Sequence, residues 1–313
     1  MTLNSPIFRR DLEHTQSLAE AISIFFGRTL EERLCIFDQE AMQGEVAQAY
    51  NALGLQSRRN TYRKIAEDFK SRTHYNNDSQ HSSRILEVGC GSGLLTLALT
   101  EQTQSIVFGL DISADMIGLA NKNKADKTEE IIQRILRQYK ENGYDLSFPV
   151  PLAFDPMPEI VDVASAITGR ARFVQGSVYN LTRPGQNEKS MDYVVCRNAL
   201  HRFRDPKEAL RQMHSILRDG GKLYIRDLKR DADWKTVVER IGEARWKTPA
   251  LVRDYLGAMA AMFTVEELAT TLRELTINKF ILTNGSYKPD NRTSTSDFKE
   301  YEQATEYVCV IEK

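Results

Sequence analysis

The sequence lacks a surplus of charge of either sign, since 42 lysines and arginines stand against 43 aspartates and glutamates. A balanced chain offers no basic surface for nucleic acid or for an anionic membrane, so we expect neither partner. Cysteine is also scarce, and Cys35, Cys90, Cys196 and Cys309 show no Cys-x-x-Cys spacing. This pattern argues against a metal site and a disulfide framework and is typical of a reduced compartment.

Long apolar runs are missing as well. No segment reaches the roughly 18 apolar residues of a membrane span. The N-terminal stretch MTLNSPIFRRDLEHTQ becomes polar too early for a signal peptide. Of the 313 residues, 41% are hydrophobic, which is enough to bury a large core. We therefore expect a soluble, cytoplasmic, globular protein.

From residue 84 onward, short β-branched runs alternate with helical patterns, which predicts a parallel sheet flanked by helices. The last two runs are separated by a polar loop instead of a helix, which predicts an antiparallel hairpin at one end of the sheet. The predicted strands are residues 84–88, 105–110, 171–174, 191–195, 222–227, 277–285 and 306–313.

Two helices carry clear boundary signals. In the segment DPKEALRQMHSILRDGG, Asp205 can cap the start, and Gly220–Gly221 is predicted to end the helix. Thr264 and Glu267 have the spacing of a capping box, which predicts a second helix start.

Three segments exceed the alternating pattern. Residues 1–76 carry helical periodicity and predict an N-terminal helical cap or lid, which leaves 77–313 as the sheet-containing domain. Residues 228–263 follow a predicted strand. Because ligands bind at the carboxyl ends of parallel strands, this insertion should cover the site. Residues 121–170 follow a predicted helix, so this insertion should emerge at the edge of the sheet opposite the site. We expect that insertion to be structural or an oligomer contact, with a homodimer as the assembly to test.

The stretch RILEVGCGSGLLTL places a glycine-rich turn directly after the first predicted strand. Gly89, Gly91 and Gly93 follow the pattern Gly-x-Gly-x-Gly, whereas a dinucleotide fingerprint needs its third glycine at Leu94. No Lys-Ser/Thr pair follows, so the turn is not a phosphate loop. Glu87 precedes the first glycine by two residues and would repel a pyrophosphate. A ligand with a cationic amine end is the better electrostatic match.

This turn resembles the first motif of the class I S-adenosylmethionine (SAM)-dependent methyltransferases, Asp/Glu-x-Gly-x-Gly-x-Gly, with Glu87 as the acid. The resemblance covers roughly residues 80–230, and Asp111 strengthens it by lying about twenty residues after the turn, at the distance of a ribose-binding acid. It implies a Rossmann-like, seven-stranded, mostly parallel sheet and SAM as cofactor. The turn would hold the methionine part, Glu87 its amino end and Asp111 the ribose hydroxyls.

The resemblance also implies the other cofactor contacts. The positions after Asp111 pack the adenine ring in this family. Where the family has Gly-Asp/Glu after the third strand, this sequence has Gly176-Ser177, so adenine recognition there is weaker or made by the backbone. The predicted cofactor-binding residues are Glu87, Gly89, Cys90, Gly91, Gly93, Asp111, Ile112, Met116, Ser177, Val178 and Asn198.

The segment CRNALHRF after the fourth strand resembles the Asn-Ala-Leu-His-His pattern of small-molecule methyltransferases of the quinone-biosynthesis type, with Arg202 replacing the second histidine. His201 is the catalytic base candidate for an acceptor that carries a proton, with packing at the start of a helix as the alternative. Arg197 is the second catalytic candidate, but it could instead bind a substrate or SAM carboxylate or pair with a nearby acid. Cys90 and Cys196 fit packing residues better than nucleophiles.

The predicted cap carries aromatic and polarizable side chains, of which we expect two or three to face the ligand. These side chains are Tyr50, Tyr62, Trp234, Trp246, Tyr255, Met259 and Phe263. An enclosed pocket favours a small organic substrate over a macromolecule. The basic run of Arg226, Lys229 and Arg230 is interleaved with acids, among them Asp227, and predicts a solvated mixed-charge face.

Three functions remain open at this point. The leading one is a SAM-dependent methyltransferase that acts on O, N or C of a small molecule. The second keeps the cofactor but cyclises the aminobutyl chain of SAM and releases methylthioadenosine. The third is a SAM-binding regulator without catalysis.

Overall fold

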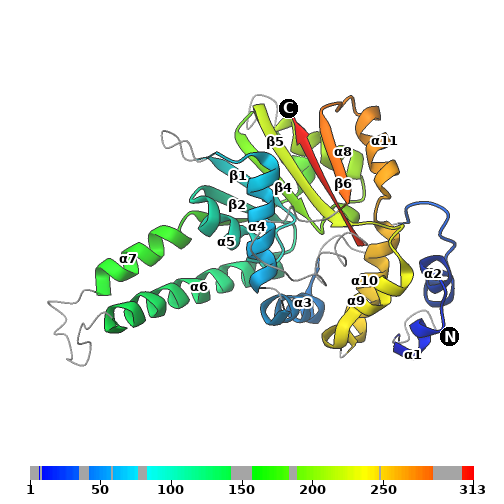
Figure 1. The fold of residues 1–313 in the computed structure, drawn as a ribbon, viewed down its shortest axis with the longest axis horizontal. Coiled ribbons are helices and arrows are strands. Elements are labelled where there is room, and N and C mark those ends of the chain that lie inside the picture. Colours follow the sequence, from blue (N-terminus) through cyan, green and yellow to red (C-terminus); the bar gives the residue numbers. More distant parts are fainter. Residues whose placement is uncertain are drawn as a thin grey trace.

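In the computed structural model, the described residues are 7, 9–34, 42–57, 59–76, 83–141, 157–182, 189–246, 248–284 and 305–313. A twisted sheet runs through the molecule, with helices on both of its faces (Figure 1). Cys35 lies outside the described residues. Within the described part, no helix is long and apolar enough to cross a membrane.

The strands form one seven-stranded sheet in the order β3-β2-β1-β4-β5-β7-β6. β1 to β5 pair in parallel, and β7 runs antiparallel to both β5 and β6. The predicted fold class, a mostly parallel sheet with an antiparallel terminal hairpin, is therefore confirmed. The strands are β1 Arg84–Val88, β2 Ile106–Asp111, β3 Ala171–Gln175, β4 Met191–Arg197, β5 Leu217–Leu228, β6 Phe280–Asn284 and β7 Glu306–Glu312.

The helices of the described chain lie before the sheet, between its strands and in the two insertions. Those before and within the first half are α1 Arg9–Glu13, α2 Leu18–Phe26, α3 Gly44–Ser57, α4 Arg59–Thr73, α5 Leu94–Thr103, α6 Ala114–Glu141 and α7 Met157–Thr168. The later ones are α8 Pro206–Ser215, α9 Trp234–Trp246, α10 Pro249–Ala261 and α11 Val265–Glu274, with the short 3-10 helices η1 Val178–Asn180 and η2 Leu200–Arg202.

The two faces of the sheet bury different helices, because successive side chains of a strand point to opposite sides. Ile85 of β1 shares one apolar cluster with Phe69 of α4 and Leu95 of α5. Its neighbour Leu86 belongs to the cluster on the other face, with Met213 of α8. Strands covered on both faces need apolar side chains at nearly every position, which explains runs such as RILEV.

One predicted helix is shorter than its glycines indicated. Asp205 caps the start of α8 as predicted, but the helix ends at Ser215 and β5 begins at Leu217, which already pairs with β4. The predicted end at Gly220–Gly221 is therefore wrong. Those glycines lie inside β5, where long-range sheet pairing outweighs a local helix-stop signal.

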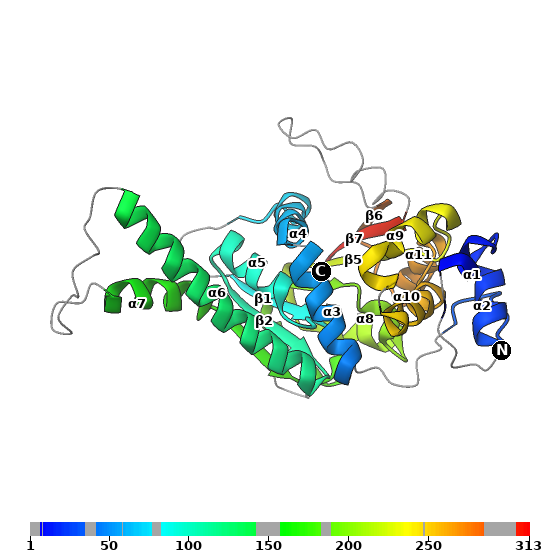
Figure 2. The same cartoon turned by 90° about the horizontal axis from the view of Figure 1, so that it is seen from below.

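The insertion at 121–170 forms a projecting arm. Helix α6 continues for 28 residues, and α7 returns along its outer part, so both helices extend away from the sheet (Figures 1 and 2). Ile131 and Ile132 of α6 pack with Ile160 and Ala164 of α7 in a small apolar cluster of their own. We call this unit, α7 with the outer part of α6, the α6–α7 arm.

The N-terminal helices divide between two places. α1 and α2 pack with α9 and α10 at one end of the sheet (Figure 2), in a cluster that includes Ile22, Val237 and Leu256. α4 instead lies on the sheet beside α5. Residues 228–263 and the first helices of the chain therefore share one core next to the site.

Candidate functional site

A cavity opens at the carboxyl ends of β1, β2 and β4, the edge at which parallel sheets bind ligands. It holds about 1330 Å³ of empty space, counting its open mouth. The loops after the strands form its inner wall, and α3, α4 and α10 contribute the outer wall. The polar residues that line it are Tyr50, Tyr62, Glu87, Ser92, Asp111, Ser177, Arg197, Asn198, His201, Arg202, Asp254 and Tyr255.

The glycine turn forms the floor of this cavity, and Gly89, Gly91 and Gly93 all have positive φ angles. A Cβ added at Gly89 would lie 2.4 Å from Cβ of Ala199, and one at Gly93 would lie 2.5 Å from the Phe173 ring. A Cβ at Gly91 would meet nothing closer than 4.0 Å. Gly91 therefore leaves open space toward the cavity, whereas the other two glycines admit neighbouring protein side chains.

Asp111 ends β2 and is tied to the glycine turn. Its carboxylate accepts a hydrogen bond from the backbone of Gly91 at 2.8 Å and another from the backbone of Ser113 at 2.9 Å. Burial raises the pKa of Asp111 above its ordinary value, while these hydrogen bonds act in the opposite direction. The acid predicted to bind ribose therefore stands at a fixed orientation on the cavity wall.

Glu87 is almost completely buried and faces the cavity from β1. It hydrogen-bonds the hydroxyl of Thr96 on α5. Desolvation by burial raises the pKa of Glu87 to about 8, against the lowering effects of the Thr96 hydrogen bond and of Arg197. Burial therefore favours the protonated form of Glu87 in the ligand-free protein.

The side chains expected around adenine line the neighbouring part of the cavity. Ile112 is exposed, and Met116 and Val178 are buried. Ser177 caps η1 by accepting a hydrogen bond from the backbone of Tyr179. The hydroxyl of Ser177 therefore has a structural role in addition to its place in the cavity wall.

The loop after β4 carries the catalytic candidates. Asn198 adopts a left-handed backbone conformation (φ 48°), and its side-chain oxygen is buried without a hydrogen-bond partner. His201 is buried in η2, and its Nδ1 lies 3.4 Å from Oδ1 of Asp227. Backbone strain and unsatisfied polar atoms of this kind concentrate at functional sites.

Asp227 is a site residue that the sequence analysis did not identify. It is completely buried at the end of β5, and its carboxylate accepts hydrogen bonds from the backbones of Leu200 and Leu228. The sequence did contain a signal for Asp227, namely an acid at the carboxyl end of a predicted central strand. The predicted solvated face of Arg226 and Asp227 is wrong, because pairing of β5 with β7 encloses both residues.

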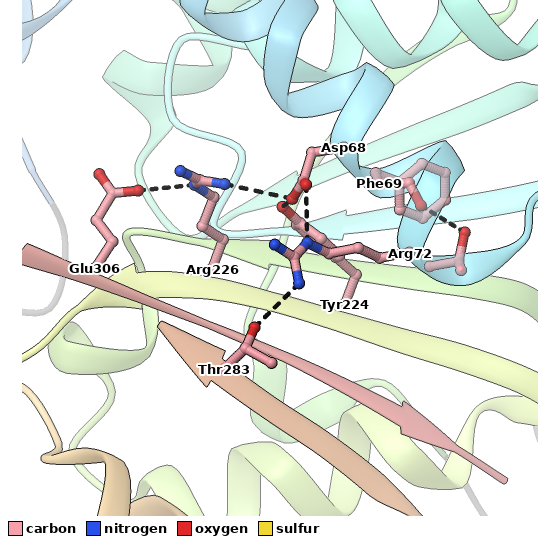
Figure 3. Close-up of polar contacts among 8 residues, drawn as sticks. Asp68, Phe69, Arg72, Tyr224, Arg226, Thr283 and Glu306 are labelled. Carbon is pink, nitrogen blue, oxygen red and sulfur yellow. Dashed lines mark hydrogen bonds and ion pairs between the residues drawn. The ribbon is translucent and has the colours of Figure 1, made fainter. Parts of the chain in front are cut away.

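Arg226 belongs to a buried network of charges. Its Nε lies 2.7 Å from Glu306, and its guanidinium lies 3.3 Å from Asp68 of α4. Asp68 also accepts hydrogen bonds from Arg72 and from Tyr224 (Figure 3). Two arginines and two acids thus balance one another and join α4 to β5 and β7.

Three of the seven cap side chains line the cavity, namely Tyr50, Tyr62 and Tyr255. Trp234 donates its ring N–H to the backbone of Thr15 instead. Met259 and Phe263 are buried in the apolar clusters. The side chain of Trp246 lies outside the described part of the chain.

The cysteines at the cavity are poorly suited to nucleophilic chemistry. Cys90 lines the cavity and Cys196 lies beneath it, and both are buried. Desolvation raises the pKa of each thiol well above its ordinary value, which keeps the thiolate population small. Among the residues described, no group of three or more histidines, cysteines and acids is placed to hold a metal ion.

The structure brings the predicted site residues together in one cavity, with one exception. Gly93 lies under Phe173 and does not line it. The lining includes Glu87, Gly89, Cys90, Gly91, Asp111, Ile112, Met116, Ser177, Val178, Arg197, Asn198 and His201. Their contacts with a cofactor stay predictions.

A family model described as "Methyltransferase domain" matches residues 39–275. Because this match covers well over half of the chain, the protein belongs to this methyltransferase family, whose cofactor is S-adenosyl-L-methionine. The resemblance to class I SAM-dependent methyltransferases is thereby confirmed. The narrower likeness to the quinone-biosynthesis branch stays a prediction.

Individual relatives agree with this family. The chain is 24% identical over 189 residues to the uncharacterized methyltransferase YcgJ of Bacillus subtilis (strain 168). The match covers 59% of this chain and 57% of YcgJ, so the chain spans a little over half the length of that curated relative.

Two solved structures share the fold. The plantazolicin methyltransferase BpumL in complex with SAH aligns with a TM-score of 0.55 at 16% identity, over 97% of both chains. The plantazolicin methyltransferase BamL, in complex with a triazolic desmethylPZN analog and SAH, aligns with a TM-score of 0.53 at 16% identity, over 87% of this chain and 91% of BamL. At this identity the likeness establishes the fold alone.

Proposed function

We propose that the protein transfers the methyl group of SAM to an oxygen, nitrogen or carbon atom of a small-molecule acceptor. The observation that carries this proposal is the cavity in which Glu87 and Asp111 flank the glycine turn from neighbouring strands. Its outer wall is built by α3, α4 and α10, and this partial enclosure favours a small acceptor over a macromolecule.

The residues present fit the cofactor. The open space at Gly91 admits a ligand against bare backbone, and the fixed carboxylate of Asp111 suits two ribose hydroxyls, since it can accept several hydrogen bonds. The apolar surfaces of Ile112, Met116 and Val178 suit a flat ring. Bound SAM supplies an activated methyl group on a sulfonium centre.

The protein's own contribution to this reaction is positioning and the exclusion of water. His201 lines the cavity beside Phe203 and Leu251. It is placed to hold the proton of an acceptor whose nucleophile is an O–H or N–H group. Asp227, fixed by two backbone N–H groups, lies 3.4 Å from Nδ1 and is placed to orient the imidazole.

If His201 holds the proton of the acceptor, changing it should lower kcat without changing the affinity for SAH. His201→Gln should lower kcat by roughly 10²- to 10⁴-fold for an acceptor that must lose a proton, and Asp227→Asn should lower it less and shift the pH dependence of kcat. SAH affinity, measured by calorimetry, should hardly change in either variant. Unchanged kcat in both variants would show that His201 only packs.

The cyclising reaction would use the same cofactor pocket. Methyl transfer is our first choice because the family model that matches residues 39–275 describes a methyltransferase domain. Cyclisation of SAM is the alternative that the product analysis must separate.

The deciding experiment is mass spectrometry of the full chain incubated with SAM, alone and with a fractionated metabolite extract. Extract-dependent SAH together with a product heavier by one methylene unit supports the proposal. Methylthioadenosine formed from SAM alone, faster than in buffer, supports cyclisation. Binding of SAM without turnover in any fraction supports the regulator. Asp111→Ala serves as the control that loses SAM binding.

A further inference from the structure

The short helix η2, which carries His201 and Arg202 at the cavity, is contacted by the N-terminal part of the chain. Arg33 lies in the segment that follows α2, and one of its terminal nitrogens donates to the backbone carbonyls of His201 and Phe203, each at 3.2 Å. Arg33 itself does not line the cavity. The two contacts join residues 168 and 170 positions apart, so they form only in the folded protein.

The contact with Arg33 satisfies carbonyl groups that η2 leaves open. The hydrogen bonds of η2 itself use the carbonyls of Ala199 and Leu200. The carbonyls of His201 and Phe203 lie beyond these bonds, and the end of a helix leaves such groups without an intrahelical partner. A guanidinium suits two neighbouring carbonyls because it holds several N–H donors in one plane. Arg33 therefore closes the end of η2.

The other end of η2 is held by Asp227. One oxygen of its carboxylate accepts a hydrogen bond from the backbone of Leu200 at 3.0 Å, and the other oxygen lies 3.4 Å from Nδ1 of His201. Because η2 has only three residues, it makes few hydrogen bonds of its own. Its orientation is therefore fixed by an acid of β5 at its start and by an arginine of the N-terminal segment at its end.

The place of Arg33 is in turn set by the insertion that covers the site. Its guanidinium lies 5.2 Å from the ring centroid of Phe263. The next residue, Leu34, donates its backbone N–H to the carbonyl of Ala260 in α10 at 2.9 Å. Residues Asp254 and Tyr255 of the same helix line the cavity. The segment around Arg33 thus joins η2 to the helix that forms the outer wall.

We propose that Arg33 is a positioning residue for the part of the cavity that η2 and α10 line. It fixes the orientation of η2 and thereby sets where the imidazole of His201 stands relative to the methyl acceptor. The N-terminal segment is then a functional part of the site as well as a cover over it. The effect on catalysis rests on the proposed role of His201, whereas the effect on η2 is measurable without any acceptor.

The first test is long-range ¹H–¹⁵N NMR of the histidine side chains in the full chain. The chain has five histidines, and the signals of His201 are those lost in His201→Gln. Arg33→Gln should shift the His201 nitrogen signals, because the ring moves relative to Asp227. Arg33→Lys keeps a cationic donor and should restore part of the wild-type shifts. Identical His201 signals in the wild type and in Arg33→Gln overturn the proposal.

Arg253 provides a matched control. From α10 it donates to the carbonyl of Phe25 at 3.3 Å and lies 4.3 Å from the ring centroid of Phe26. It thus makes the same two kinds of contact as Arg33, but with α2 in place of η2. Arg253→Gln should lower the melting temperature about as much as Arg33→Gln and leave the His201 signals unchanged. If it shifts them as strongly, general loosening of the cap explains the effect and the assignment to Arg33 fails.

The second test measures the rate of SAH formation with saturating SAM and the active extract fraction. Arg33→Gln should lower this rate roughly 10- to 100-fold, because a displacement of about 1 Å at a reacting group has effects of this size. Its affinity for SAH should stay within about twofold of wild type. An equal loss of SAH affinity would overturn the proposal by assigning Arg33 a general structural role.

Comparison with His201→Gln separates the two ways in which the rate prediction can fail. If His201→Gln lowers the rate and Arg33→Gln does not, His201 acts in the reaction but Arg33 does not position it, and the present proposal is wrong. If neither variant lowers the rate, the proposed role of His201 is wrong, and the catalytic effect of Arg33 fails with it.

Discussion

The backbone of the glycine turn has positive φ at Gly89, Gly91 and Gly93, but the surroundings of the three residues differ. At Gly89 the missing side chain makes room for Ala199, and at Gly93 it makes room for Phe173. The signature that indicates SAM binding is thus partly a packing requirement. Packing is tested most directly at Gly93, which does not line the cavity, and space for a ligand at Gly91, where an added Cβ would meet no protein atom closer than 4.0 Å.

Gly89→Ala should destabilise the protein by roughly 1–3 kcal/mol, because its Cβ would overlap Ala199. Adding Ala199→Gly should recover much of this loss and leave the backbone strain of about 1 kcal/mol. Gly118→Ala is the control, since Gly118 lies in α6 with nothing within 4 Å of an added Cβ. It should be neutral or stabilising in the same urea unfolding experiment. A double variant no more stable than Gly89→Ala would show that the steric explanation is wrong.

Glu87 should make the affinity for the cofactor depend on pH. Its pKa is raised to about 8 in the ligand-free protein, and pairing with an ammonium group must lower it, so binding releases a proton. Affinity for SAH should therefore rise between pH 6 and pH 7.5, by up to about tenfold per pH unit. Calorimetry in buffers of different ionisation enthalpy measures that release.

The matched variant is Glu87→Gln, for which the pH dependence should be nearly flat. The same raised pKa has the opposite effect on folding, because the native state holds a proton that the unfolded chain loses above its ordinary pKa of 4.5. The contribution of Glu87 to stability is full below that pH and declines toward pH 8. Equal pH dependence in wild type and Glu87→Gln would contradict both statements.

At the scale of elements, helix α4 is joined to the sheet by charge as well as by apolar packing. Asp68 lies on the buried side of α4 and contacts Arg72, Tyr224 and Arg226. Tyr62 of the same helix lies against Arg197. Correct docking of α4 therefore matters both for the core and for the outer wall of the cavity.

Asp68→Ala should cost roughly 3–5 kcal/mol of stability, because it removes one of the two acidic partners of the buried Arg226 and the carboxylate that pairs with Arg72. Glu67→Gln on the same helix removes a half-exposed ion pair with Arg63 and should change stability by less than about 1 kcal/mol. Urea unfolding of the two variants gives the comparison. Similar small losses in both would mean that the network is not a determinant of α4 docking.

At the scale of the whole molecule, the α6–α7 arm is separate from the site. Its apolar cluster does not merge with the clusters on the sheet. In addition, the described arm residues do not line the cavity. The arm is thus the part of the molecule where a change should leave cofactor binding intact, and its role as an oligomer contact stays a prediction.

Ile131→Ala should weaken the arm by roughly 2–4 kcal/mol, because it opens a cavity in a small core. Hydrogen exchange should speed up in α7, while the affinity for SAH stays within about twofold of wild type. Light scattering on both proteins tests the homodimer, which this variant should weaken if the arm is its contact. A large loss of SAH affinity would show that the arm is coupled to the site.

Patterns that depend on neighbours in the chain were predictable. The first strand matches β1, Asp205 caps α8, and Thr264 with Glu267 forms the capping box of α11. Glu87, Gly91 and Asp111 could be placed in one site because the carboxyl ends of parallel strands converge. These features follow from backbone propensities and from the order of elements along the chain.

Burial and pairing depend on segments that are far apart in the chain, and they were misjudged or left open. Arg226 and Asp227 look like surface residues until β7 covers β5. Arg197 lies against the ring of Tyr62, a contact between residues more than one hundred positions apart in the chain. Patterns among neighbouring residues therefore suffice to predict the strands, the glycine turn and its two acids. The electrostatic state of the site is decided by tertiary packing, because the groups that exclude solvent and supply counter-charges come from distant parts of the chain.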